Sequence, residues 1–199
     1  MADAQNLVFN PSFTLGNTEF STDYNYSSDL WTEGNYFVGS DPRNYNPLAP
    51  SFGDHTTGSG LMYLANGNLN AGAVVWTESL AVAPNTAYQF TGWTASWGQD
   101  STGTSGSDPS PARLLLSVGG EVSQPFTLVA TDGVWIQFSQ AWSSGSATTV
   151  VLSIVDQNTD SYGNDFALDD LNFSAQPVPE PASLAILGMG ALALLRRRR

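Results

Sequence analysis

The chain has 199 residues with no cysteine, no lysine and one histidine, and its formal net charge is −12. These absences exclude disulfides, thiolate metal sites, Schiff-base and P-loop chemistry, and multi-histidine metal sites. Residues 1–176 contain two arginines and seventeen acidic residues, a net charge of −15, and a chain this acidic repels nucleic acid, so we exclude nucleic-acid binding.

The N-terminal residues do not resemble an export signal. Met1-Ala-Asp-Ala-Gln5 has no basic region and no apolar stretch of the length that a signal peptide needs. Ala2-Asp3-Ala4 does have the small-x-small pattern of a signal-peptidase site. We therefore expect that the recorded start lies too late or that a signal has been trimmed.

Short runs rich in Val, Thr, Phe, Tyr and Trp alternate with turn residues and indicate an all-β domain. Apolar residues recur at every second position in 114–118 and 150–154, as in a sheet with one buried face. We expect an antiparallel two-sheet sandwich over residues 1–176. The predicted strands are Leu7–Phe9, Leu61–Asn66, Ala73–Val82, Thr86–Trp97, Ala112–Val118, Phe126–Val129, Val134–Trp142, Ala147–Asp156 and Phe166–Ser174.

Two polar stretches, 16–60 and 98–111, are predicted as loops, where β scaffolds usually carry their binding residues. The first contains His55 between Asp54 and Thr56, which invites a general-base interpretation. A lone loop histidine is more often a structural residue, and no Gly-x-Ser-x-Gly elbow supplies a nucleophile. A pair of acids could still serve a glycosidase, but the acids are too numerous to single out a pair. We expect a non-catalytic protein.

The predicted strand 86–97 has one face that mixes polar and aromatic side chains. Trp93 and Trp97 share the parity of Gln89 and Thr91. Aromatic rings pack on the apolar faces of pyranose sugars, so Trp93 and Trp97 are predicted glycan contacts. The alternative is that these rings fill the core or brace loops.

Trp97 is the tryptophan that we expect to matter most for glycan binding. It adjoins the polar stretch 98–111, where a ring can stay exposed beside hydrogen-bonding groups. Trp135 and Trp76 adjoin apolar runs and are expected to pack inside the domain.

The last predicted strand changes its apolar parity between 166–168 and 171–173. The change falls at Asp169-Asp170 and predicts a β-bulge. A bulge can turn one carboxylate inward, where it needs hydrogen-bond donors or a cation. Because Ca²⁺ prefers carboxylate and carbonyl oxygens, calcium at Asp169 and Asp170 is one interpretation, and two solvent-facing aspartates are the other.

The composition changes at Gln176. Prolines at 177, 179 and 181 form a stiff linker, followed by fourteen uncharged residues and four arginines. As a helix, the uncharged run spans about 21 Å, short of the ~30 Å hydrocarbon core, so spanning relies on snorkelling or bilayer thinning. The positive-inside rule puts the arginines in the cytoplasm. The membrane segment includes Ala182, Leu184, Leu187, Leu192 and Leu195, and the anchor is Arg196, Arg197, Arg198 and Arg199.

Val178-Pro179-Glu180-Pro181, the apolar run and the arginine cluster together resemble the PEP-CTERM sorting signal, also labelled an ice-binding protein C-terminal domain. The resemblance covers residues 177–199 and implies export across the inner membrane of a Gram-negative bacterium. It also implies transient retention in that membrane and processing by an exosortase near Val178, Pro179, Glu180 and Pro181. Such proteins commonly belong to the exopolysaccharide and biofilm matrix.

The body of the chain resembles a second family. Residues 6–13, Asn-Leu-Val-Phe-Asn-Pro-Ser-Phe, are similar to the opening strand of galactose-binding-like jelly rolls, the architecture of many carbohydrate-binding modules. The resemblance implies a jelly roll over residues 5–174. Relatives often hold a structural calcium with a glutamate where this chain has Thr14. Further similar segments are 52–58, 75–76, 84–90 and, at the closing strand, 163–171.

Two functional classes remain for the body of the chain. The lack of a decisive ligand motif favours a structural matrix protein, whereas the face with Trp93 and Trp97 favours a calcium-dependent carbohydrate-binding module. We expect an exported cell-surface or matrix protein whose partners are an exosortase, the inner membrane and polysaccharide. Calcium is the one cofactor that we predict.

Overall fold

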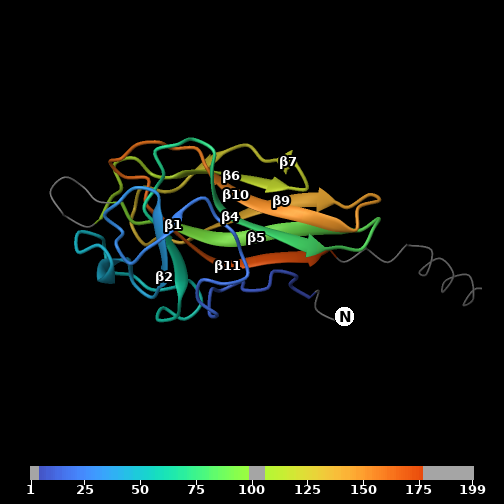
Figure 1. Cartoon of the computed structure of the whole chain (residues 1–199), viewed down its shortest axis with the longest axis horizontal. Coiled ribbons are helices and arrows are strands. Elements are labelled where there is room, and N and C mark those ends of the chain that lie inside the picture. Colours follow the sequence, from blue (N-terminus) through green and yellow to red (C-terminus); the bar gives the residue numbers. More distant parts are fainter. Residues whose placement is uncertain (1–4, 99–105, 177–199) are drawn as a thin grey trace, which may run out of the picture.

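The computed structural model describes residues 5–98 and 106–176 as two β-sheets packed face to face (Figure 1). All strand pairs are antiparallel except the pair of β1 with β2. The six-stranded sheet has the order β1 (Asn25–Tyr26), β2 (Asn35–Gly39), β3 (Met62–Ala65), β11 (Phe166–Ala175), β5 (Ala87–Ser96) and β9 (Ile136–Ser143). The other sheet has the order β4 (Ala73–Ala81), β10 (Thr149–Asp156), β6 (Arg113–Val118) and β7 (Glu121–Val122), and β8 (Phe126–Thr127) pairs with β6.

The main core lies between the two sheets. The predicted alternation is confirmed, because Leu114, Leu116 and Val118 of β6 all point into this core and are buried. Trp76 of β4 stacks on Phe90 of β5 across the interface, with ring centroids 5.9 Å apart. The prediction that Trp76 packs inside the domain is therefore confirmed. The arrangement is the predicted all-β, two-sheet jelly-roll architecture.

A second apolar cluster covers part of the outer face of the six-stranded sheet. It contains Leu30, Ala49, Met62, Leu64, Trp97 and Ala167. Met62 and Leu64 lie on β3, while Leu30 and Ala49 come from segment 27–60, whose parts before and after β2 fold over this face. Half-buried Trp135 packs against the same cluster. This segment therefore gives one end of the sheet a second buried layer.

The long segment 16–60 is more regular than predicted. It contains β1, β2 and a short 3-10 helix, Pro42–Asn44, rather than loop alone. Tyr45 follows this helix, and its ring lies so close to Gly39 that a Cβ there would be 2.3 Å from Tyr45 Cε2. Glycine at position 39 thus lets β2 pass directly beneath the aromatic ring.

The predicted first strand, Leu7–Phe9, is not a strand in the structure. The segment instead docks on β11 through single bonds, from Leu7 N–H to Phe173 O at 2.9 Å and from Phe173 N–H to the Asn6 Oδ1 at 3.0 Å. The segment does not form a continuous series of backbone hydrogen bonds with β11, because the side chain of Asn6, and not a backbone carbonyl, accepts from Phe173 N–H.

The predictions for the linker, the membrane segment and the arginine anchor lie outside the described residues. They concern Val178, Pro179, Glu180 and Pro181, the run 182–195, and 196–199. Among residues 5–98 and 106–176, no helix has the length and apolar character needed to cross a membrane.

Candidate functional site

The β-bulge predicted in the closing strand is present in β11. The pairing of β11 with β5 shifts register between Asp169 and Asn172, and Asp170 has the left-handed φ of 49°. Leu168 and Leu171, on either side of the bulge, both point into the main core. Because the bulge adds one residue, Leu168 and Leu171 can both face the main core although they are three positions apart. Asp169 and Asp170, between them, lie on the outer face of the sheet.

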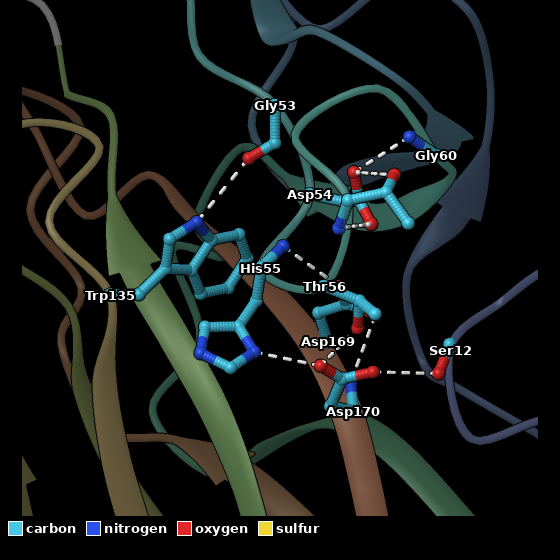
Figure 2. A network of polar contacts seen from close by, with 10 residues as sticks. Ser12, Gly53, Asp54, His55, Thr56, Gly60, Trp135, Asp169 and Asp170 are labelled. Carbon is cyan, nitrogen blue, oxygen red and sulfur yellow. Dashed lines mark hydrogen bonds and ion pairs between the residues drawn. The ribbon is translucent and has the colours of Figure 1, made fainter.

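Hydrogen-bond donors surround both carboxylates of the bulge (Figure 2). Asp169 is fully buried and accepts from the backbone N–H of His55 at 2.9 Å and of Asp170 at 2.8 Å. Asp170 accepts from Ser12 Oγ at 2.7 Å and from Thr56 Oγ1. We call these residues the bulge network. They tie the N-terminal segment and the loop around His55 to one point of β11.

His55 completes the bulge network. Its Nδ1 lies 2.7 Å from Asp170 Oδ2, and its other ring nitrogen points away from that carboxylate (Figure 2). The ring stacks on Trp93 at 3.9 Å between centroids and meets Trp135 edge-on at 5.8 Å. Ion pairing and stacking together fix the imidazole, so the arrangement favours the structural interpretation of His55.

The pKa values of the two neighbouring carboxyl groups are shifted in opposite directions. Burial, followed by the charge of Asp170, raises the pKa of Asp169 to about 6. Burial alone would also raise the pKa of Asp170, but hydrogen bonds from His55, Thr56 and Ser12 lower it below its usual value. Asp170 is thus the stable anion of the pair, and His55 is its partner.

Asp54 shapes the loop that carries His55. Its carboxylate accepts hydrogen bonds from the N–H of Gly60 at 2.6 Å and from the N–H and hydroxyl of Thr57 at 3.0 and 2.8 Å. By accepting these backbone N–H groups, the side chain of Asp54 closes a tight turn, as aspartate side chains do in many loops. Trp135 Nε1 holds the same loop by donating to Gly53 O at 3.3 Å.

The donors around Asp169 and Asp170 are N–H and O–H groups, which is one of the two partner types expected for a buried carboxylate. Each of the four carboxylate oxygens accepts at least one hydrogen bond. Among the described residues, no three His, Asp or Glu side chains are placed together to hold a metal ion. Calcium at this pair stays a prediction.

The prediction that Trp97 is an exposed glycan contact is wrong. Trp97 has no exposed surface, and its Nε1 donates to Phe166 O at 2.9 Å. It does share the outer face with Trp93, as the parity indicated, but segment 27–60 covers that end of the sheet. Trp93 is half-buried, and the stacked His55 occupies one side of its ring.

A groove of about 500 Å³ opens along strand β4, and none of its lining residues belongs to the bulge network. We call it the Phe9–Glu78 groove. Phe9 is 65% exposed, and Glu78 Oε1 accepts the backbone N–H of Phe9 at 3.2 Å. The groove therefore combines an open aromatic ring, carboxylates and hydroxyls. Its lining residues are Phe9, Glu19, Phe20, Ser21, Thr77, Glu78, Ser79 and Val151.

Glu78 is the unusual residue of this groove. It is only 8% exposed, and its Oε2 has no hydrogen-bond partner. Burial, opposed by the bond from Phe9 and assisted by the charge of Glu19, raises the pKa of Glu78 to about 7. Sequence reasoning missed it, although a signal existed: Glu78 is an acid with the inward parity of Trp76 and Leu80 in an apolar strand.

Comparison with known proteins assigns the C-terminal segment. Residues 177–199 match the model of the PEP-CTERM protein-sorting motif. This signal implies exosortase-dependent sorting of an exported protein to the cell surface. A search of curated proteins finds no match.

Solved structures identify the fold of the body. The xylan-binding domain CBM22-1 of Xyn10C from Paenibacillus barcinonensis is 16% identical, with a TM-score of 0.50 over 90% of this chain and 100% of that one. A cyclase from Fischerella sp. TAU is 14% identical, with a TM-score of 0.58 over 88% and 100%. The tailspike protein 4 domain of bacteriophage CBA120 is 11% identical, with a TM-score of 0.51 over 86% and 21%. These similarities show the jelly-roll fold, and two of them, the cyclase and the enzymatically active tailspike domain, are to enzymes.

Proposed function

We propose that this chain is an exported, non-catalytic polysaccharide-binding protein of the cell surface or extracellular matrix. The observation that carries the proposal is the Phe9–Glu78 groove. The sorting motif supports the location, because it is the signal of exported proteins. The jelly-roll body supports the activity by analogy, since the fold occurs in a xylan-binding domain.

The groove has the chemical groups that sugar recognition needs. The exposed ring of Phe9 offers an apolar surface to the C–H face of a pyranose. The exposed carboxylate of Glu19 can accept from sugar hydroxyls, and the hydroxyls of Ser21 and Ser79 can donate or accept.

Charge narrows the class of polysaccharide. Glu19 and Glu78 both line the groove, and residues 1–176 have a net charge of −15. A uronic-acid or sulfated chain would bring further negative charge to this surface, at a cost of like-charge repulsion. We therefore propose a neutral polysaccharide as the ligand.

Affinity electrophoresis of the full-length chain in mild detergent tests the proposal, with gels that contain neutral or acidic polysaccharides. We expect a neutral polysaccharide to retard the unaltered chain and not the Phe9→Ala variant. Trp31→Ala is the matched control, because Trp31 is an exposed aromatic residue outside the groove, and this variant should be retarded as the unaltered chain is. Trp93→Ala tests the earlier prediction that Trp93 contacts glycan. No retardation by any polysaccharide would favour the matrix protein that makes only protein contacts.

The same samples test the non-catalytic part of the proposal. We expect no release of reducing ends from a retained polysaccharide. Release that is lost in Glu78→Gln would instead make Glu19 and Glu78 an acid pair of a glycosidase, in which a raised pKa suits the general acid.

The sorting segment is proposed to hold the protein transiently in the inner membrane through 182–195 and the arginines 196–199. Fractionation of cells that lack an exosortase tests this, with the full-length chain compared with one that ends at Gln176. Equal recovery of both proteins in the soluble fraction would contradict membrane retention.

A further inference from the structure

Polar side chains from three segments meet at the beginning of β11. Register places them together: Tyr36 of β2 pairs with Ala65 of β3, and Ala65 pairs with Phe166 of β11. The neighbouring residues Asn66 and Asp165 therefore adjoin each other at the same end of the sheet. Gly67 N–H donates to Asp165 Oδ1 at 3.3 Å, which confirms their proximity.

Glu33 and Asn164 complete this group, which we call the Asp165 cluster. The residue after Glu33, Gly34, donates its N–H to the carbonyls of Asn66 at 3.1 Å and of Gly67 at 2.8 Å. The side chain of Asn164 lies against Gly67, where an added Cβ would be 2.2 Å from Asn164 Nδ2. Asn164 and Asp165 thus contact the turn at Gly67, Asn66 precedes it, and Glu33 adjoins the glycine that bonds to it.

Three side-chain oxygens of the Asp165 cluster are buried without a hydrogen-bond partner: Glu33 Oε2, Asn66 Oδ1 and Asn164 Oδ1. Asn66 is 3% exposed and Asn164 is fully buried. Each such oxygen costs the desolvation of an unpaired acceptor, about 1–3 kcal/mol. The unpartnered oxygens are the feature that distinguishes this cluster from the bulge network.

The orientation of both amides is fixed by their nitrogens. Asn164 Nδ2 donates to Asp156 Oδ2 at 3.0 Å and to Asn158 O at 3.1 Å. Asn66 Nδ2 donates to Leu30 O at 3.0 Å. A flip of either amide would place its oxygen against another oxygen, so Oδ1 is the unpartnered atom in both residues.

No basic side chain balances the acids of the Asp165 cluster. Within residues 5–98 and 106–176, the one ion pair joins His55 to Asp170, in the bulge network. Asp165 is 3% exposed, Glu33 Oε2 is buried, and the two carboxyl groups lie close enough to interact electrostatically. Buried carboxylates of this kind require a proton or a cation.

We propose that the Asp165 cluster binds Ca²⁺ through side-chain oxygens of Glu33, Asn66, Asn164 and Asp165. Two carboxylates and two amide oxygens form an all-oxygen donor set, which Ca²⁺ accepts and which lacks the nitrogen and sulfur ligands that zinc prefers. The amide oxygens are essential, because the described residues contain no group of three His, Asp or Glu placed for a metal. The site is independent of the Phe9–Glu78 groove and of its ligand.

Calorimetric titration of the EDTA-treated full-length chain in mild detergent with CaCl₂ tests the proposal, together with thermal melts in Ca²⁺ or Mg²⁺. We expect binding at millimolar Ca²⁺ or tighter and a rise of several degrees in Tm that Mg²⁺ does not match. Glu33→Gln should weaken binding by about tenfold or more, and Asp165→Asn should abolish it. Both variants keep the side-chain shape and remove a buried charge, so they are expected to fold.

Asp170→Asn is the matched control, because it removes a carboxylate of the bulge network in β11 and leaves the Asp165 cluster unchanged, so this variant should bind Ca²⁺ as the unaltered chain does. Loss of binding in Asp170→Asn with retention in Asp165→Asn would place the ion at the bulge and overturn the proposal. Absence of binding to the unaltered chain would also overturn it, and would leave protonation as the way in which the cluster is neutralised. An equal rise in Tm with Ca²⁺ and Mg²⁺ in all variants would indicate general charge screening and overturn it too.

Discussion

Trp93 and Trp97 lie four residues apart on the same face of the six-stranded sheet, yet their environments differ. Trp97 is fully buried in the second apolar cluster, beneath Leu30 and Ala49 of segment 27–60. Trp93 is half-buried, and His55 of a polar loop stacks on its ring. We call these two regions the covered end and the open end of the outer face. The sheet supplies the same kind of surface at both ends, and the segment that crosses it decides which ring is exposed.

Different interactions therefore stabilise the two ends of the outer face. At the covered end apolar side chains are removed from water, which stabilises in proportion to buried area. At the open end the loop is held by the ion pair of His55 with Asp170 and by a few hydrogen bonds. Mutations at the covered end should therefore affect global stability, and those at the open end should affect the attachment of one loop.

The largest effect is expected for Trp97→Ala. Removal of a buried aromatic side chain costs about 3–5 kcal/mol, so Tm should fall by on the order of 10 °C. Trp31→Ala, which changes a 51% exposed ring of the covering segment, should change the unfolding free energy by less than about 0.5 kcal/mol. Denaturant unfolding of both variants measures the difference. Equal small effects would contradict a buried Trp97.

A smaller loss is expected for Asp170→Asn, which keeps the shape and tolerates the positive φ. Loss of the charged partner of His55, Ser12 and Thr56 should cost about 2 kcal/mol at neutral pH. The pKa of Asp170 lies below its ordinary value of 3.8, so its stabilisation is present above that pH and disappears as the pH falls through the folded-state pKa. Unfolding at neutral and acid pH should show the gap to the unaltered chain closing in acid.

His55→Phe separates stacking from ion pairing at the open end. The ring can still stack on Trp93, but the bond of Nδ1 to Asp170 is lost. We expect a loss of about 1 kcal/mol. His55→Ala, which removes the stacking as well, should lose more and should shift tryptophan fluorescence to longer wavelength as Trp93 gains solvent. Identical results for the two variants would mean that stacking contributes nothing.

The smallest effect is expected outside both ends, for Glu78→Gln. The pKa of Glu78 is raised from 4.5 to about 7 by folding. The protonated Glu78 therefore stabilises the folded state below pH 4.5, and this stabilisation is lost as the pH rises through the folded-state pKa of about 7. The glutamine variant does not titrate. Its Tm relative to the unaltered chain should therefore rise between pH 5 and pH 8, by on the order of 2 °C. A constant difference across this range would contradict the raised pKa.

Local patterns in the sequence predicted the features that depend on strand periodicity. The parity change at Asp169-Asp170 identified the bulge, and the alternation in 114–118 identified a core strand. Coverage could not be predicted in the same way. Whether Trp97 is exposed depends on where segment 27–60 folds, and those contacts join residues more than thirty positions apart in sequence, such as Leu30 and Trp97.

The candidate sites were predicted less well than the fold, for a related reason. The Phe9–Glu78 groove requires the N-terminal segment to dock beside β4, whereas the sequence pattern predicts a regular strand at Phe9. The partners of Asp169 and Asp170 come from Ser12 and from the loop at His55, which no local pattern connects to β11. Residue types at these positions were visible, but their meeting is a property of the tertiary structure.

The position of β11 has a consequence for how the chain is made. This strand is the last one of the described chain, yet it lies in the middle of its sheet, between β3 and β5. Until residues 166–175 are available, β1, β2 and β3 have no strand that joins them to β5 and β9. The six-stranded sheet can therefore close only after residues 166–175 have been synthesised, when almost all of the described chain is present.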